Sequence, residues 1–190
     1  MVQNNLNSSF GEYSIALGEE TKATGKYAIA AGNHTEADGE CSHAEGYYSR
    51  AYGKGSHAEG RGCDEDDIVF VKLSGKANDT VYSVKSSFGE IKAGLIMSYN
   101  NVYAKILSYD SSKQEITLEN TLSEEKDLDD SVRLYTSMAY KNYSHVEGYC
   151  TTASGVDAHA EGTLTIASSN HSHAEGEGTI ASAYGAHAEG

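Results

Sequence analysis

Glycine recurs with a strict step of seven residues along two stretches of this chain. In the first stretch the glycines run from Gly11 to Gly60, and the step resumes at Gly148, with Ser169 and Ala183 replacing two of the glycines. Small residues, mostly Ala, Ser and Thr, occupy the second and fourth positions before each glycine. Small side chains at alternate positions line one face of a strand, whereas glycine at every seventh position would destabilise a helix. Each heptad is therefore predicted to be a short strand followed by a tight bend.

Two kinds of heptad alternate, so the full repeat has 14 residues. One kind is exemplified by SIALG at 14–18 and SHAEG at 42–46, and the other by TKATG at 21–25. Two strands per repeat, stacked at the roughly 4.8 Å spacing of paired strands, make a flattened parallel β-solenoid. Its interior holds only methyl and hydroxyl groups, which requires two sheets that lie close together.

The repeats are poor in large apolar side chains. Residues 1–60 and 141–190 contain 12 Val, Ile, Leu, Met or Phe residues, against 22 in residues 61–140. At roughly 1.5–3 kcal/mol per large buried side chain, the repeats alone do not easily offset the entropy lost on ordering. They need partners that cover the outward face of one strand, so we expect the chain to oligomerise.

The alternation of SIALG-type and TKATG-type heptads resembles the YadA-like head of trimeric adhesins, and the SHAEG variant is similar to repeats of bacteriophage tail fibres and prophage surface proteins. The resemblance implies an all-β fold, a left-handed parallel β-roll with 14-residue repeats that forms a homotrimer. In that family the Ile of SIALG faces the trimer axis. The implied trimer-axis ladder, together with the glutamates two positions further on, is Ile15, Ile29, His43, His57, His145, His159, His173, His187, Glu45, Glu59, Glu147, Glu161, Glu175 and Glu189.

Replacement of Ile by His predicts a polar axis beyond the first two repeats. Like charges directly opposite each other destabilise neighbouring strands, and the glutamate column does not alternate in sign, unlike Lys22, Glu36 and Arg50. Histidines beside it can donate hydrogen bonds or carry charge, so we expect an inter-subunit His–Glu lattice that stabilises or rearranges the trimer at about pH 5. The alternative is that H-x-E across three chains binds Zn, Ni or Fe. A repeated hydrogen-bond ladder accounts for the H-x-E motif in every repeat without requiring one particular metal site. We therefore expect neither a metal nor a cofactor.

Residues 61–143 are predicted to form an inserted domain between β-roll repeats at 1–60 and 144–190. Its strand-like runs predict a small antiparallel β-barrel or sandwich of five or six strands, and residues 123–131 a loop or helical turn. These runs are Ile68–Leu73, Thr80–Lys85, Gly94–Tyr99, Val102–Tyr109, Glu115–Glu119 and Val132–Thr136.

Insertions on a rigid scaffold are frequent binding sites, so this domain is the candidate element for binding a receptor or glycan, and a spacer is the alternative. Tyrosine is typical of sugar-stacking surfaces and of interfaces. The candidate glycan contacts are Tyr47, Tyr48, Tyr52, Tyr140, Tyr143 and Tyr149.

Charge and motifs exclude several classes of function. A formal net charge of −14 argues against binding to nucleic acid, and no apolar run suits membrane insertion. Cys41, Cys63 and Cys150 match no zinc or disulfide spacing and are interpreted as thiols without a framework role. No catalytic motif occurs, and Ser and His of SHAEG face opposite ways on a strand, so we do not expect an enzyme.

The sequence thus predicts a structural and host-attachment segment of a trimeric fibre, a phage or prophage tail fibre. The alternative is the head domain of a bacterial cell-surface adhesin. The expected partners are two further copies of the chain, a host surface glycan or protein, and other tail components. The expected location is the virion or the bacterial surface, after synthesis in the cytoplasm, because the N-terminus lacks the pattern of a signal peptide. Because the sequence ends on a repeat at Gly190, without a polar cap, we also expect a longer natural chain.

Overall fold

The computed structural model describes residues 10–62, 69–88, 91–99, 102–122, 131–135 and 138–190. The chain forms two compact units, Met1–Asp64 together with Thr136–Gly190, and Glu65–Tyr135. Every regular element in the described residues is a β-strand, as the sequence predicts. These residues include no helix with the length and apolar character of a membrane span.

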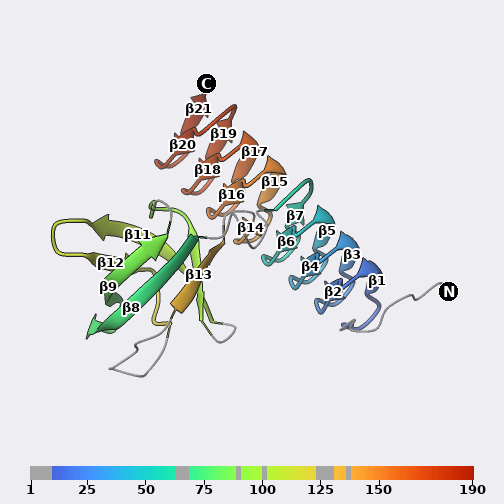
Figure 1. Cartoon of the computed structure of the whole chain (residues 1–190). Coiled ribbons are helices and arrows are strands. Elements are labelled where there is room, and N and C mark those ends of the chain that lie inside the picture. Colours follow the sequence, from blue (N-terminus) through green and yellow to red (C-terminus); the bar gives the residue numbers. More distant parts are fainter. Residues whose placement is uncertain (1–9, 63–68, 89–90, 100–101, 123–130, 136–137) are drawn as a thin grey trace. The chain divides into compact units, whose positions relative to one another are not determined.

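The first unit is a parallel β-solenoid, whose coils are stacked side by side in Figure 1. Strands 14 residues apart pair in register, such as Ile15 with Ile29 and Lys22 with Glu36. One sheet contains β1 (Ile15–Glu19), β3 (Ile29–Asn33), β5 (His43–Tyr47), β7 (His57–Ala58), β15 (His145–Tyr149), β17 (His159–Thr163), β19 (His173–Glu175) and β21 (His187–Glu189). The other contains β2 (Lys22–Ala23), β4 (Glu36–Ala37), β6 (Arg50–Ala51), β14 (Met138–Ala139), β16 (Thr152–Ala153), β18 (Ile166–Ala167) and β20 (Ile180–Ala181).

The solenoid continues across the insertion without a change of register. His57 pairs with His145, and Ala51 pairs with Ala139. The solenoid therefore resumes at β14, before the boundary at residue 144 that the glycine pattern suggested. The pattern missed this strand because Lys141 stands where the repeat has glycine, with its carbonyl oxygen next to Gly53 in the rung before.

Alanines fill the interior of the solenoid. Ala23, Ala30 and most of their equivalents in the other rungs are buried, with Val146 in place of alanine in one rung and Ala188 only partly buried in the last. The buried Ser and Thr side chains lie beside them. The Ser56 hydroxyl donates a hydrogen bond to the Gly53 carbonyl at 2.7 Å, three residues earlier. A core of methyl and hydroxyl groups, as predicted, allows the two sheets to lie close together.

Glycine is required because successive rungs approach each other at the bends. A Cβ atom on Gly32 would lie 2.0 Å from the carbonyl oxygen of Gly46, and Gly32 also has a φ of 126°. Other left-handed positions lie two residues after a repeat glycine, or after the residue that replaces it, and are mostly not glycine, a feature that the sequence did not reveal. They are Tyr13, Glu20, Tyr27, His34, Cys41, Tyr48, Tyr143, Cys150, Asp157, Leu164 and His171.

The second unit is a closed antiparallel barrel, which decides between the two predicted architectures. All six predicted strands are present, in the order β10-β11-β12-β9-β8-β13 around the barrel. Residues 123–130 of the predicted loop lie outside the described residues. The strands are β8 (Val69–Asn78), β9 (Val81–Phe88), β10 (Ile96–Tyr99), β11 (Val102–Asp110), β12 (Glu115–Leu118) and β13 (Ser131–Tyr135).

Large apolar side chains fill the barrel. Leu73, Ile96, Ile106 and Ile116 are fully buried. The buried Tyr82 ring belongs to the same core, and its hydroxyl accepts a hydrogen bond from the backbone N–H of Leu122 at 3.0 Å. The barrel therefore has the conventional hydrophobic core that the solenoid lacks.

One cysteine corrects the interpretation of these residues as thiols without a structural role. Cys150 is disulfide-bonded, whereas Cys41 is a free and exposed thiol. The spacing of three cysteines in the sequence did not reveal a bridge, because pairing depends on which turns the fold brings together.

Candidate functional site: the histidine–glutamate face

Six histidines form one continuous stack along the outer face of the larger solenoid sheet. Each directly precedes an alanine or valine of the solenoid core, and successive side chains of a strand point to opposite faces, so each histidine points away from the core. Adjacent rings have centroids 4.6–4.9 Å apart and are parallel within 4°. The stack includes neighbours 88 residues apart in sequence, and consists of His43, His57, His145, His159, His173 and His187.

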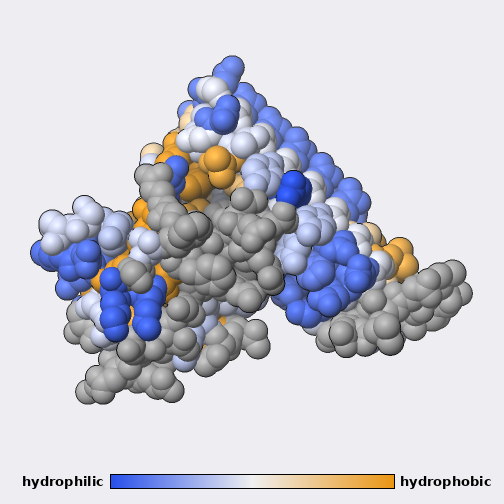
Figure 2. Space-filling model, viewed as in Figure 1, coloured by the Kyte–Doolittle hydropathy of each residue, from blue (hydrophilic) through white to orange (hydrophobic). Residues whose placement is uncertain are grey.

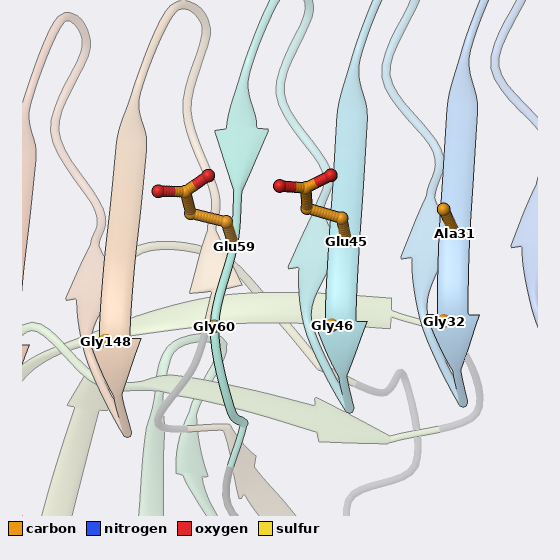
Figure 3. A pocket seen from close by; sticks show the side chains of 7 residues that line it. All are labelled: Ala31, Gly32, Glu45, Gly46, Glu59, Gly60 and Gly148. Atoms are coloured by element: carbon orange, nitrogen blue, oxygen red, sulfur yellow. The ribbon is translucent and has the colours of Figure 1, made fainter.

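The glutamates two positions later form a second column beside this stack. In Figure 3, Glu45 and Glu59 project in the same direction from neighbouring strands, at the level where the earlier rung carries Ala31. The backbone next to them is glycine, which leaves a shallow groove along the column. A similar groove follows Glu147, Glu161, Glu175 and Glu189.

Histidine and glutamate of the same rung are close but not hydrogen-bonded. The His Nε2 to Glu Oε2 distances are 3.6–3.9 Å, beyond the 2.7–3.2 Å of a hydrogen bond. The Nε2 atoms of His57, His145, His159 and His173 are buried and have no hydrogen-bond partner. Within one chain, these four Nε2 atoms therefore make no hydrogen bond, and the inter-subunit His–Glu lattice stays a prediction.

Burial favours neutral imidazole at three histidines of the stack, His57, His145 and His159. Burial, and then the neighbouring imidazoles His145 and His43, lower the pKa of His57, and Glu59 and Glu45 only partly oppose this. Burial also lowers the pKa of His145 and His159. Protonation of these three histidines therefore works against the folded state of the single chain, and acid stabilisation of a trimer stays a prediction.

The first two rungs present apolar side chains on the same face. Ile15 and Ile29 occupy the position of the histidines and are 49% and 39% exposed, with Leu17 exposed beside them. Figure 2 shows hydrophobic surface beside the first rungs, near β1. The predicted ladder therefore has an apolar end and a polar remainder.

The opposite sheet carries the predicted ladder of alternating charge. Lys22 Nζ lies 2.7 Å from Glu36 Oε1, and Arg50 Nε lies 3.2 Å from Glu36 Oε2. Burial alone would raise the pKa of Glu36, but the charges of Arg50 and Lys22 outweigh burial and lower it. This ladder is internally compensated, whereas the glutamate column on the histidine face is not.

The tyrosines proposed as glycan contacts are distributed over several stacks. Tyr47 and Tyr149 lie on either side of the Arg61 guanidinium, with centroid distances of 5.8 and 5.5 Å. The Tyr48 ring stacks on His34 at 4.5 Å. The faces of these rings that contact a neighbour within the chain are not free to stack on a sugar.

The remaining three tyrosines differ in exposure. Tyr52 and Tyr140 stack at 5.5 Å, and Tyr140 is buried. Tyr143 is 56% exposed at a left-handed turn position. The structure therefore leaves Tyr143 as the most open of the six candidates.

Comparison with known families identifies the first repeats. Residues 11–35 match the family model of the YadA head domain repeat, in two copies. The N-terminal repeats are similar to YadA head repeats. The resemblance of the SIALG-type and TKATG-type heptads is thereby confirmed at residues 11–35, and the same 14-residue pairing continues through the later rungs of the solenoid. A comparison with curated proteins finds no significant match.

Proposed function

We propose that this chain is a segment of a homotrimeric fibre, a phage or prophage tail fibre, and that its barrel contacts the host. The YadA head repeats indicate a trimeric, adhesin-like head or fibre. The proposal places the His–Glu face and the apolar residues Ile15 and Ile29 along the trimer axis. We do not assign an enzymatic activity, and the buried Ser56 beside the outward His57 supports a structural role for SHAEG.

The observation that carries the proposal is the exposed apolar end of the face beside a core made almost entirely of small side chains. Full burial of an exposed isoleucine gains roughly 1.5–3 kcal/mol, so covering the exposed parts of Ile15 and Ile29 gains roughly 1 kcal/mol each. Covering them in a trimer also adds the large apolar contacts that the solenoid interior lacks. Self-association therefore supplies the burial that one chain does not have.

The mass of the full chain in solution tests the trimer. Light scattering coupled to size-exclusion chromatography is expected to give three times the 20.3 kDa chain mass. The double variant Ile15→Lys/Ile29→Lys is expected to shift the mass towards the monomer, whereas Leu164→Lys, a change at an exposed turn, leaves it unchanged. A compact monomer of the unaltered chain at micromolar concentration would contradict the proposal.

A glycan array probed with the full chain tests host attachment. Binding to a surface glycan is expected. Tyr143, which is exposed and belongs to the solenoid unit, makes Tyr143→Ala the first variant to compare, as a test of the tyrosine candidates and not of the barrel. Tyr184→Ala is a matched control, because Tyr184 is more exposed and lies near the end of the solenoid. If binding is found and neither variant changes it, the contact lies elsewhere on the chain, and the tyrosine assignment is wrong.

The second candidate is the head of a bacterial cell-surface adhesin. Tail-assembly genes beside the coding region favour the fibre, whereas an outer-membrane anchor in the full-length chain favours the adhesin. Both candidates place the protein outside the cytoplasm after its synthesis there, in the virion or at the cell surface. The disulfide at Cys150 supports such a location, because disulfides persist mainly in oxidising environments.

A further inference from the structure

One histidine of the stack, His173, lies close to two glutamates of the neighbouring column, one in the preceding rung and one in its own rung. Nε2 of His173 lies 3.7 Å from Oε1 of Glu161 in the preceding rung and 3.9 Å from Oε2 of Glu175 in its own rung. We propose that these three atoms bind a divalent transition-metal ion of the Zn²⁺ or Co²⁺ class. The inference goes beyond the proposed fibre function, since all three ligands come from one chain.

The distances between the ligand atoms suit an ion better than a direct hydrogen bond. Zinc binds imidazole nitrogen and carboxylate oxygen at about 2.0–2.2 Å, which places two ligands of a tetrahedral ion roughly 3.4 Å apart. The observed separations of 3.7 and 3.9 Å exceed this by only a few tenths of an ångström. Both carboxylates must rotate towards Nε2 of His173 to bring their oxygen atoms to the separation that one ion requires.

The histidine atom is a ligand without a partner. Nε2 of His173 is buried and makes no hydrogen bond, which is costly for a polar atom unless another group fills the gap. Neutral imidazole offers a lone pair there, and imidazole together with carboxylate is a normal donor set for zinc. The orphaned nitrogen is an observation independent of the carboxylate cluster.

Ring geometry decides how many histidines one ion takes. The donor atoms of His159, Glu161 and His173 lie within 4.8 Å of one another, so a pair of histidines is a possible alternative. However, these rings are parallel within 4° and their centroids are 4.7 Å apart. An imidazole lone pair lies in the plane of its ring, and an ion cannot lie in two parallel planes. One histidine with two carboxylates is therefore the better set.

Charge favours the same site. The ion pairs of Glu161 and Glu175 in the described part of the chain are all with histidines. Glu36, on the other sheet, has Lys22 and Arg50. Like charges that face each other on neighbouring strands are destabilising, and a divalent cation between two carboxylates removes that repulsion.

A cobalt titration of the full chain, after removal of metal with a chelator, tests the inference. Visible ligand-field bands of tetrahedral Co²⁺ are expected to develop to saturation, and Zn²⁺ is expected to displace them. The variant Glu161→Gln/Glu175→Gln is expected to bind Co²⁺ at least about tenfold more weakly, because loss of even an outer-shell partner commonly costs 10- to 100-fold.

Two further variants separate loss of the site from loss of the fold. Glu12→Gln/Glu40→Gln removes the same charge from carboxylates that pair with Lys26 and Lys54, and is expected to leave Co²⁺ affinity unchanged. His173→Ile places at this position the residue that the first two rungs already carry, so the solenoid is expected to fold and Co²⁺ to bind at least about tenfold more weakly. Absence of Co²⁺ bands in the unaltered chain would overturn the inference, as would equal affinity in the Glu161→Gln/Glu175→Gln variant. Neither result depends on whether the chain is a trimer or binds a host.

Discussion

The solenoid and the barrel are both built from strands, but the contacts that stabilise them differ. In the solenoid each strand pairs with one that lies 14 residues away, or 88 residues away across the insertion, and the interior is alanine. In the barrel β8 pairs with β13, more than fifty residues later, around large side chains such as Leu73 and Ile106. The barrel thus depends on burial of apolar surface, whereas the solenoid depends on close approach of backbones and repeated ladders.

This difference has a consequence for mutations. Removal of a large side chain matters in the barrel, where such side chains fill the core. Addition of a single methyl group matters in the solenoid, where no space exists between rungs. The solenoid and the barrel should therefore tolerate different kinds of substitution.

The largest expected effect is a cavity in the barrel. Ile106→Ala should destabilise the barrel by about 2–5 kcal/mol, because Ile106 is fully buried. Hydrogen exchange should show lost protection in β8–β12 with protection retained in the solenoid. The neighbouring Leu107 is exposed, and Leu107→Ala should have little effect. Equal loss of protection in the solenoid would show that the two units do not respond separately.

A methyl group between rungs should affect the solenoid instead. A Cβ atom on Gly162 would lie 2.1 Å from the carbonyl oxygen of Gly176, and the φ of Gly162 is 100°. Gly162→Ala should therefore lower the free energy of unfolding by about 2–3 kcal/mol, as strain at a glycine-only conformation adds to the clash.

Gly178→Ala separates strain from the clash. Gly178 has a φ of 69°, but its Cβ atom would meet nothing within 4 Å. Its replacement should therefore cost only the left-handed penalty of about 1–2 kcal/mol. If thermal unfolding gives the same loss for Gly162→Ala and Gly178→Ala, close approach is not what fixes glycine at the bends.

Acid should weaken the histidine stack, in metal-free protein, by a smaller amount. The pKa of His57 and His145 is lower in the folded chain than its usual value of about 6.5, so below that pH the unfolded chain binds protons that the folded chain does not. The melting temperature should fall as the pH decreases from about 6.5 towards the lowered pKa values.

Replacement of the two histidines gives the control. The variant His57→Ile/His145→Ile should show a smaller pH dependence of melting over the same range, because Ile does not titrate. Glu45 and Glu59 oppose the lowering of the His57 pKa, so the variant keeps both glutamates. A melting temperature that rises on acidification of the unaltered chain would support the acid-stabilised lattice instead.

The smallest expected effect is a gain of stability at a turn. Leu164 is exposed and has a φ of 57°, a conformation that costs most residues about 1–2 kcal/mol. Leu164→Asn should raise stability by about 0.5–1 kcal/mol, because Asn tolerates this conformation better. Leu107→Asn, at an exposed strand position, should give no gain. A lower melting temperature for Leu164→Asn would show that the leucine makes a contact worth more than the strain.

The sequence by itself determined the features that repeat. Glycine every seventh residue and small residues between them specify strands, rungs and the register that brings His57 next to His145. The six strands of the barrel were also predictable, since each has its own apolar run between turn residues. These features are local or periodic, so a strand's neighbour follows from counting residues.

Only the tertiary structure decided features that depend on how side chains and turns meet. It placed β14 in the solenoid although Lys141 replaces the repeat glycine, and it closed the six strands into a barrel rather than a sandwich. It also placed Cys150 in a disulfide, and it placed Nε2 of His173 between two carboxylates without a hydrogen bond. These features depend on packing between segments far apart in the chain and on the rotamers that side chains adopt. The period of a repeat determines neither.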